Sequence, residues 1–384
     1  MKPNYTLLLL ATGLTLTGPA WAQQPSPQAA QEIQALRQRI ADLEKLKERL
    51  DRLERQIAAQ KAAAAQKPAD TTKPAAPKPA APAVKLSGYV QARFETNITP
   101  KGQSDFSIRR ARVKVQGDPT PWSSVVYQVE AAGANVTTLD AYADLRPKSL
   151  PFLRAGQFKV PFGLEVAENP ADRLAPEASK AVSTLFGTLR DRGFMLGHEI
   201  KANQPGVSVF LAALNGNGSN ARDNNGTKDV ALRVVRPFTW GALGASYYTG
   251  RFTRGVTTKD ATGASITTDV TTSKERYGAE ALVSLGRAEV RSEYIAGHDL
   301  GASVSGGYAQ AAYTLKKPTG TPFVKYDWYD KNRNAGGDWY SRWSLGYAHQ
   351  LGANTRLTLA EQIIHDSATP KGDNVTTVQV QVKF

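Results

Sequence analysis

The chain has 384 residues, of which 41% are hydrophobic, and a formal net charge of +14. It contains no cysteine, which excludes disulfides and thiolate metal sites. The four histidines stand far apart and share no recognisable spacing with a serine or aspartate: His198, His298, His349 and His365. We therefore expect no catalytic residue, no metal site and no cofactor.

The first 22 residues predict a cleaved signal peptide. Lys2 supplies the positive start, Leu7 to Leu16 form a short apolar run, and Ala20-Trp21-Ala22 reads as a cleavage site. The alternative is an uncleaved anchor helix, but the run is too short for a bilayer of about 30 Å. No later stretch approaches the ~18 apolar residues of a membrane helix, so insertion requires strands. Export also argues against nucleic acid as a partner.

Residues 23–60 predict a periplasmic helix that forms a coiled coil. The apolar positions follow a heptad pattern with one extra step of three between Leu43 and Leu46. They are Ile33, Leu36, Ile40, Leu43, Leu46, Leu50, Leu53 and Ile57. A parallel oligomer, most simply a trimer, would bury this seam, whereas the alternative is a helix that packs on its own barrel.

Residues 61–84 predict an extended linker, because alanine, proline and lysine make up almost all of it. Its lysines could contact peptidoglycan or anionic lipid, or they could simply solvate the segment.

From Lys85 to Phe384 the hydrophobic pattern changes to a period of two, which predicts strands. It is clearest at the end, where Val378, Val380 and Val382 alternate with polar residues before the final Phe384. About sixteen such segments of roughly ten residues fit between these limits. The predicted fold is all-β, a transmembrane antiparallel β-barrel of about 16 strands, preceded by the α-helical coiled coil.

Charged residues on the polar faces distinguish a wide membrane barrel from a small soluble one. Unpaired charges would cost several kcal/mol in a dry core, whereas a barrel of sixteen strands encloses water. Aromatic residues near strand ends suit the two membrane interfaces: Trp122, Trp240, Tyr247, Trp339 and Trp343.

Three motifs resemble the phosphate-selective porin O and P family of outer-membrane channels. They are FSIRRARVKVQGDP (Phe106–Pro119), LDAYADLRP (Leu139–Pro147) and FLRAGQFKVPFGLE (Phe152–Glu165), and the NGNG turn at Asn215–Gly218 is similar as well. The resemblance implies an outer-membrane, sixteen-stranded homotrimer whose constriction is lined by arginine and lysine and favours anions. The lysines of the family's phosphate site have no local motif here.

Positive charges follow one face of the segment that begins at Phe106. Arg110, Arg112 and Lys114 alternate with apolar residues that are expected to face lipid. We therefore expect these three side chains to point into the pore and attract anions. Arg109 has the other parity and is expected to reach the membrane interface. The alternative is that these arginines pair with Glu130, Asp140 and Asp144 on neighbouring strands.

Two segments predict loops. Pro161 to Gly193 is too long for a simple connection and is expected to fold inward and narrow the bore. The threonine-rich stretch from Val256 to Thr272 is expected to be an exposed external loop.

We therefore expect passive diffusion of small anions, phosphate first among them, through an outer-membrane pore. The predicted path is lined by Arg93, Arg110, Arg112, Lys114, Arg146, Arg173, Lys180, Arg190 and Arg192. Two alternatives stay open, namely a general, weakly selective pore and a barrel whose prefix tethers the outer membrane to the cell wall.

Overall fold

The computed structural model describes seven stretches of the barrel region and scattered positions between residues 34 and 59. The seven stretches are residues 84–97, 103–148, 151–201, 204–259, 264–317, 319–367 and 374–384. The chain divides into two compact units, Met1–Lys78 and Pro79–Phe384.

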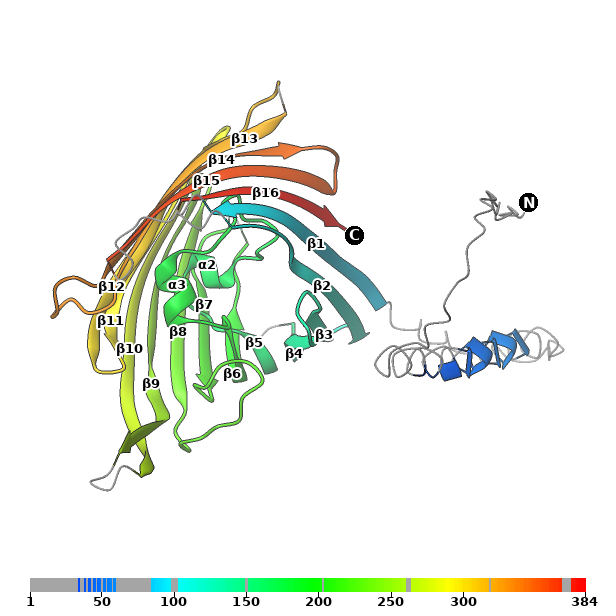
Figure 1. Cartoon of the computed structure of the whole chain (residues 1–384), viewed down its shortest axis with the longest axis horizontal. Helices are drawn as coiled ribbons and strands as arrows, with labels where there is room; N and C mark the ends of the chain where they lie inside the picture. The colour runs from blue at the N-terminus through cyan, green and yellow to red at the C-terminus, as the bar shows by residue number, and fades with distance from the viewer. Residues whose placement is uncertain are drawn as a thin grey trace, which may run out of the picture. The chain divides into compact units, whose positions relative to one another are not determined.

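The second unit is a closed antiparallel barrel in which each strand pairs with its neighbours in the chain and β1 pairs with β16. Its strands are β1 Val84–Asn97, β2 Ser104–Thr120, β3 Ser123–Glu130, β4 Thr137–Leu145, β5 Phe152–Lys159, β6 Arg190–His198, β7 Ser208–Leu214, β8 Asp229–Phe238, β9 Gly241–Lys259, β10 Ser265–Leu285, β11 Ala288–Asp299, β12 Ala302–Tyr313, β13 Gly320–Asp330, β14 Trp339–Gln350, β15 Thr355–Asp366 and β16 Asn374–Lys383. This confirms the predicted barrel and its sixteen strands (Figure 1).

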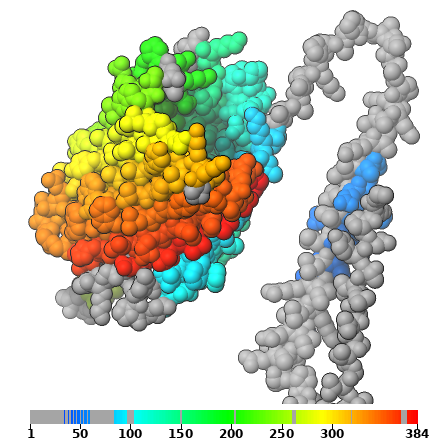
Figure 2. All heavy atoms as spheres, turned by 90° about the horizontal axis from the view of Figure 1, so that it is seen from above, coloured from blue at the N-terminus to red at the C-terminus, as the bar shows by residue number. Residues whose placement is uncertain are grey.

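The two ends of the barrel sequence close the sheet. Val90 lies opposite Val382, and the terminal Phe384 exchanges backbone hydrogen bonds of 3.0 Å with Gly88. In the space-filling view the red strand β16 lies beside the cyan β1, and the wall continues through orange and yellow without a gap (Figure 2). Closure gives the backbone of every strand partners on both sides, which lipid requires.

Side chains alternate between the outside and the inside as the period of two predicts. On β2, Val113 and Val115 are exposed outward, while Arg110, at the opposite parity of the same strand, is buried inside. Figure 1 shows one rim closed mainly by tight turns. Trp122 and Trp240 lie in two of these turns, between β2 and β3 and between β8 and β9. The opposite rim carries the long connections, residues 160–189 and 215–228.

Two predicted boundaries were wrong. The threonine-rich stretch from Val256 to Thr272 is mostly exposed, as predicted, but most of it belongs to β9 and β10 rather than to a loop. Threonine favours strands, and its hydroxyls pair across the hairpin. Thr253 pairs with Thr271 at 2.7 Å and Thr257 with Thr267 at 2.9 Å. At the start of the barrel, Val84 already belongs to β1 rather than to the linker.

In the first unit, the described positions between residues 34 and 59 are helical and exposed. The apolar seam, the signal peptide and the linker up to residue 83 lie outside the described residues, so the coiled coil stays a prediction. Within the part of the chain that the structure describes, no helix is long and apolar enough to cross a membrane.

The alternation predicts how the barrel responds to charge on each face. Val113→Lys places an ammonium on the outer face near the middle of β2, where it should cost about 2–4 kcal/mol if it lies at the bilayer midplane. Lys114→Met changes the neighbouring inward position and should cost far less. Urea unfolding in lipid vesicles measures both, and equal costs would contradict the assignment of the two faces.

Candidate functional site

The connection between β5 and β6 folds into the barrel. This segment, residues 160–189, is called the constriction loop below, and it contains the short helices α2 (Leu164–Ala167) and α3 (Lys180–Leu185). Helix α3 contacts β12 and β13 from the inside (Figure 1). The sequence placed the end of this loop at Gly193, which was wrong, because β6 begins at Arg190 and pairs with β5 from there.

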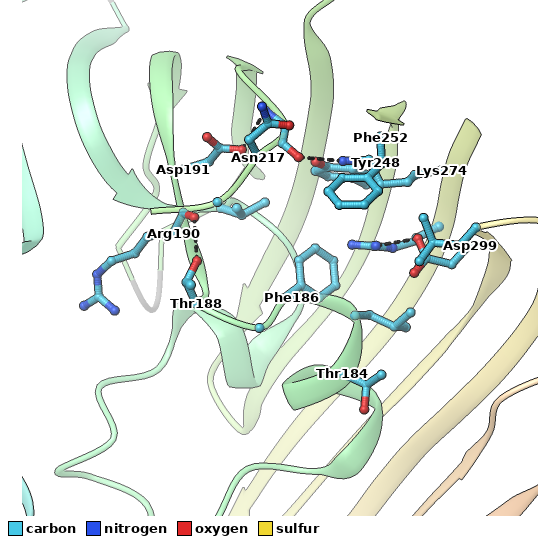
Figure 3. Close-up of a pocket in the computed structure, with 17 residues that line it drawn as sticks. Thr184, Phe186, Thr188, Arg190, Asp191, Asn217, Tyr248, Phe252, Lys274 and Asp299 are labelled. Atoms are coloured by element: carbon cyan, nitrogen blue, oxygen red, sulfur yellow. Dashed lines mark hydrogen bonds and ion pairs between the residues drawn. The ribbon is translucent and has the colours of Figure 1, made fainter. Parts of the chain in front are cut away.

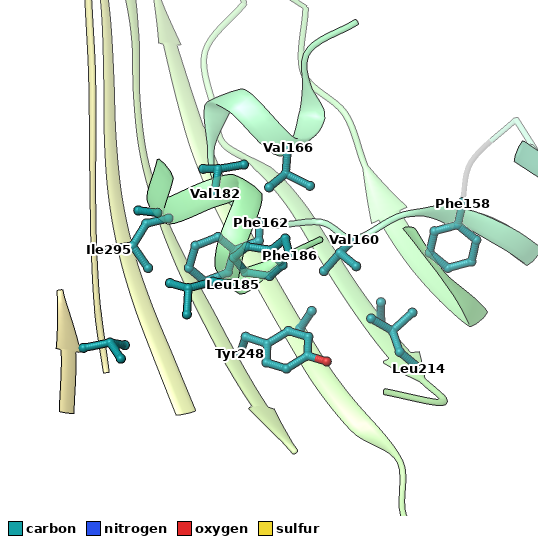
Figure 4. Close-up of a cluster of buried hydrophobic side chains, with 14 of the residues drawn as sticks. Phe158, Val160, Phe162, Val166, Val182, Leu185, Phe186, Leu214, Tyr248 and Ile295 are labelled. Atoms are coloured by element: carbon teal, nitrogen blue, oxygen red, sulfur yellow. The ribbon is translucent and has the colours of Figure 1, made fainter. Parts of the chain in front are cut away.

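Apolar side chains fix the constriction loop to one side of the inner wall. Phe162, Val166 and Val182 are fully buried, and Figure 4 shows Phe162, Leu185 and Phe186 gathered beside Tyr248 of β9. Glycines on the wall make room for them. A Cβ on Gly278 would lie 2.8 Å from the Phe162 ring, and one on Gly306 would lie 2.8 Å from Cβ of Ala181.

A buried ion pair fixes the same part of the constriction loop. Glu165 pairs with Lys325 of β13, and both side chains are almost completely buried. Glu165 also accepts a hydrogen bond from the backbone N–H of Ser179 at 2.7 Å. Burial raises the pKa of Glu165, but the charges of Lys325 and Arg173 and these hydrogen bonds outweigh burial and lower its pKa to about 2. The carboxylate is therefore ionised at neutral and mildly acidic pH.

Further cations of the wall hold the backbone of the constriction loop. Guanidinium groups donate to its carbonyl oxygens: Arg93 to Pro176 at 2.8 Å, Arg342 to Ala178 at 2.6 Å, and Arg356 to Ala171 at 3.1 Å and to Arg173 at 2.7 Å. Because carbonyl groups inside the barrel need hydrogen-bond donors, these arginines have a structural role.

Glu177 of the constriction loop lies among three arginines of β1 and β2. Its carboxylate is 2.6 Å from Arg93, 2.8 Å from Arg109 and 3.6 Å from Arg110. Burial raises the pKa of Glu177, but the hydrogen bond from Arg109 and the charges of Arg93 and Arg110 outweigh burial and hold the pKa well below its ordinary value. Two guanidinium groups on adjacent residues, Arg109 and Arg110, thus reach the same carboxylate.

The prediction that Arg109 reaches the membrane interface was wrong. The pairing of β1 with β2 shifts by one residue here, since Gln91 lies opposite Arg110 whereas Ala92 lies opposite Ile108. This β-bulge leaves Arg109 as the extra residue and releases it from the alternation of the strand. Its side chain can therefore turn to Glu177 inside the barrel.

A cavity of about 490 Å³ lies between the constriction loop and the wall around β2 and β4. We call it the arginine cavity, because five arginines line it: Arg109, Arg110, Arg112, Arg173 and Arg190. Glu177 is the single carboxylate among its lining residues. Thr137, Thr138, Ser219 and Asn220 add neutral polar groups, so the lining offers mostly hydrogen-bond donors and positive charge.

Several of these arginines are paired with carboxylates that do not line the cavity. Arg112 pairs with Glu130 at 2.8 Å, Arg190 with Asp140 at 2.8 Å, and Arg173 with Glu168 at 3.3 Å. The pairing alternative of the sequence analysis is therefore correct for Arg112. Because these three carboxylates do not line the cavity, its lining carries five guanidinium groups against one carboxylate, that of Glu177.

The other predicted path residues lie outside the arginine cavity. Arg93 is buried behind Glu177. Arg146 pairs with Asp144 at 2.9 Å beside a separate cavity, near the turn between β2 and β3. Lys180 lies 5.0 Å from the centre of the Tyr340 ring. Arg192 donates to Gln157 at 3.4 Å, and Lys114 is half-buried on β2.

The sequence analysis missed Arg109 and Glu177 as part of this site, and it missed the anchors Lys325, Arg342 and Arg356. A β-bulge has no distinct signal in the run Ile108-Arg109-Arg110, and the anchors depend on how the constriction loop folds. Within the described ranges, no group of three or more histidine, aspartate or glutamate side chains could hold a metal ion.

Comparisons with known proteins agree with this architecture. The family model of phosphate-selective porin O and P matches residues 84–322. No curated protein matches the chain. The chain has the same fold as OmpT from Vibrio cholerae in its trimer form, with 10% sequence identity, a TM-score of 0.59 and coverage of 79% of this chain and 100% of that one. Salmonella typhi OmpF in complex with daunomycin is 14% identical, with a TM-score of 0.59 and coverage of 78% of this chain and 97% of that one. An anion-selective porin from Comamonas acidovorans is 13% identical, with a TM-score of 0.58 and coverage of 79% of this chain and 100% of that one.

The buried pair of Glu165 and Lys325 predicts how the constriction loop can be released from the wall. Lys325→Met leaves Glu165 buried without its cation, which costs about 3–5 kcal/mol for a broken buried pair. Since this side of the constriction loop depends on the pair, we expect a larger single-channel conductance and new protease cleavage between residues 160 and 189. Lys331→Met removes a partly exposed pair with Asp366, away from the constriction loop, and serves as the control. Conductance and cleavage equal to those of the control would contradict the anchoring role.

Proposed function

The chain belongs to the phosphate-selective porin O and P family, and from that premise we propose that it forms a water-filled outer-membrane channel for passive diffusion of small anions, with phosphate the first candidate. The observation that carries the proposal is the arginine cavity, whose lining holds five arginines and one glutamate. Fixed positive charges in a narrow bore concentrate anions and repel cations.

The shape of the arginine groups supports small oxyanions among the possible solutes. A guanidinium is planar and carries donors in a fork that matches phosphate or carboxylate oxygens. Arg110 and Arg112 lie two residues apart on β2, so they point to the same side of the strand, and Arg190 lines the cavity from β6. An anion could therefore exchange between neighbouring guanidinium groups rather than bind one of them tightly, which permits exit.

The pairing of these arginines supports modest rather than strict selectivity. Glu130, Asp140 and Glu168 each neutralise one arginine of the cavity from outside its lining. This partial neutralisation supports a second candidate function, a general pore with only a weak preference for anions. The homotrimer, the tethering role and the contact with peptidoglycan through residues 23–84 stay predictions.

Reversal potentials in planar bilayers under a potassium chloride gradient test the anion preference. We expect chloride to permeate more readily than potassium in the native channel. Arg110→Gln with Arg112→Gln should lower this preference several-fold, because each unit charge near the ion contributes about 1 kcal/mol at 4 Å even in water. Arg236→Gln, which removes an exposed charge of β8 near the rim, is the matched control. A native channel that prefers potassium would refute the proposal.

Glu177→Gln should change the preference for chloride over potassium in the opposite direction. It removes the single carboxylate that lines the arginine cavity while keeping the size of the side chain. We expect the chloride-to-potassium permeability ratio to rise about two- to fivefold, on the same Coulombic scale. A fall in this ratio would show that the arginines around Glu177 do not face the permeating ion.

The effect of added phosphate on the chloride current distinguishes a phosphate channel from a general pore. If phosphate occupies the arginine cavity, it should reduce the chloride current in a saturable manner, and the effect should weaken in Arg112→Gln. A chloride current that phosphate does not affect would favour the general pore while the anion preference still stands.

A further inference from the structure

The rim of the barrel with the tight turns is positively charged. Seven connections lie at this rim, from the one after β2 to the one after β14. They contain six basic residues and one acidic residue, namely Arg146, Lys148, Lys201, Arg287, Lys316 and Lys317 against Glu199. The connections of this rim can therefore attract anionic groups that lie outside the bore.

Three of these cations form one group on neighbouring connections, which we call the rim cluster: Arg287, Lys316 and Lys317. Arg287 lies between β10 and β11, and the two lysines lie between β12 and β13. The backbone N–H of Thr314 donates to the carbonyl oxygen of Arg287 at 2.8 Å, which joins the two connections. All three side chains of the rim cluster are exposed to solvent.

Among the described residues, no carboxylate pairs with the rim cluster. Glu289 is close to it in sequence but points away from the outer face. It alternates with Val290, which is 47% exposed outward, and its carboxylate lies 3.5 Å from Nε of Arg291. Cations inside the barrel differ, as Figure 3 shows for Arg276, which pairs with Asp299 at 2.6 Å. The rim cluster thus has positive charge available to a partner from outside the chain.

The rim cluster lies where the apolar outer face of the barrel ends. Leu285 and Tyr313 are 65% and 48% exposed on that face, as the last outward residues of β10 and β12. Arg287 follows Leu285 by two residues, or about 7 Å along a strand. The headgroup layer beside the hydrocarbon is roughly 5–8 Å thick. The long side chains of the rim cluster therefore reach the level of the lipid headgroups.

The next connection around the rim, between β8 and β9, supplies aromatic residues at the same level. The carbonyl oxygen of Trp240 accepts the backbone N–H of Ser284 at 2.6 Å, so this connection is joined to β10. The ring of Phe238 stacks on Trp240 with 4.7 Å between the ring centres, and the guanidinium of Arg236 lies 5.3 Å from the Phe238 ring. Aromatic and basic side chains together are typical of the interface between membrane and water.

We propose that the rim cluster is a binding site for the headgroup of an anionic phospholipid in the adjacent leaflet. The lipid phosphate lies among the three cations, and the acyl chains follow the apolar outer face at Leu285 and Tyr313. The guanidinium of Arg287 offers a fork of donors to phosphate oxygens, and the lysines add charge. The site lies outside the bore, so it requires the barrel to span a membrane but does not require the anion path.

Native mass spectrometry of the full chain in a non-ionic detergent tests the site. The chain is titrated with phosphatidylglycerol, which is anionic, or with phosphatidylcholine, which has no net charge. We expect the native chain to bind phosphatidylglycerol about tenfold more tightly or better. Arg287→Gln with Lys316→Gln and Lys317→Gln should lower the affinity for phosphatidylglycerol about tenfold or more, since each basic group near an anionic lipid contributes about fivefold. The affinity for phosphatidylcholine should not change.

Arg251→Gln with Arg254→Gln and Lys259→Gln is the matched control, because it removes three exposed cations from the end of β9 at the opposite rim. This variant should bind phosphatidylglycerol as the native chain does. Equal affinities of the native chain for the two lipids would overturn the site, as would equal losses in the two triple variants. Displacement of phosphatidylglycerol by millimolar inorganic phosphate would also overturn it, because the site would then take a free anion.

Channel recordings separate this site from the proposed function. Because the rim cluster consists of exposed residues of the connections, its triple variant should still open channels in planar bilayers, which shows that the variant barrel has assembled. A native channel that prefers potassium refutes the anion path and leaves the lipid site standing. Anion preference without a preference for phosphatidylglycerol refutes the lipid site alone.

Discussion

Hydrocarbon offers the peptide backbone no hydrogen-bond partner, and this constraint shapes the whole of the barrel region. The sheet closes through β1 and β16, so no strand is left with a free edge along the barrel. Side chains must then alternate between lipid and the interior, and charged residues of the strands are stable mainly on the inner face. The lumen therefore holds the arginines, lysines and carboxylates that fix the constriction loop and line the arginine cavity.

The same residue type has two roles inside the barrel, and position decides between them. Arg342 and Arg356 donate to carbonyl oxygens of the constriction loop and hold it in place. Arg110 and Arg112 of β2 line the arginine cavity. Apolar packing around Phe162 and the Glu165–Lys325 pair complete the attachment. The constriction loop is thus held inside the barrel, and the arginine cavity through which we propose that anions pass lies between it and β2.

Much of this could be predicted from the sequence, because a period of two is a local property. It placed Arg110 and Arg112 inside and Val113 outside, and it indicated sixteen strands. It failed at Arg109, because a β-bulge inserts one residue and its cause lies in the pairing with β1. The pairs of Arg190 with Asp140 and of Glu177 with Arg93 depend on register and on how the constriction loop folds, which no local pattern contains. Threonine-rich β9 and β10 were misread because polarity was taken to indicate a loop.

We propose that anions concentrate between the constriction loop and the arginines of β2. Anomalous diffraction from crystals of the full chain soaked separately in sodium bromide and in rubidium chloride tests it directly. We expect bromide within contact of Arg110 and Arg112 in the arginine cavity and no rubidium there. Rubidium in that cavity, with bromide absent from it, would show that the cavity does not select anions.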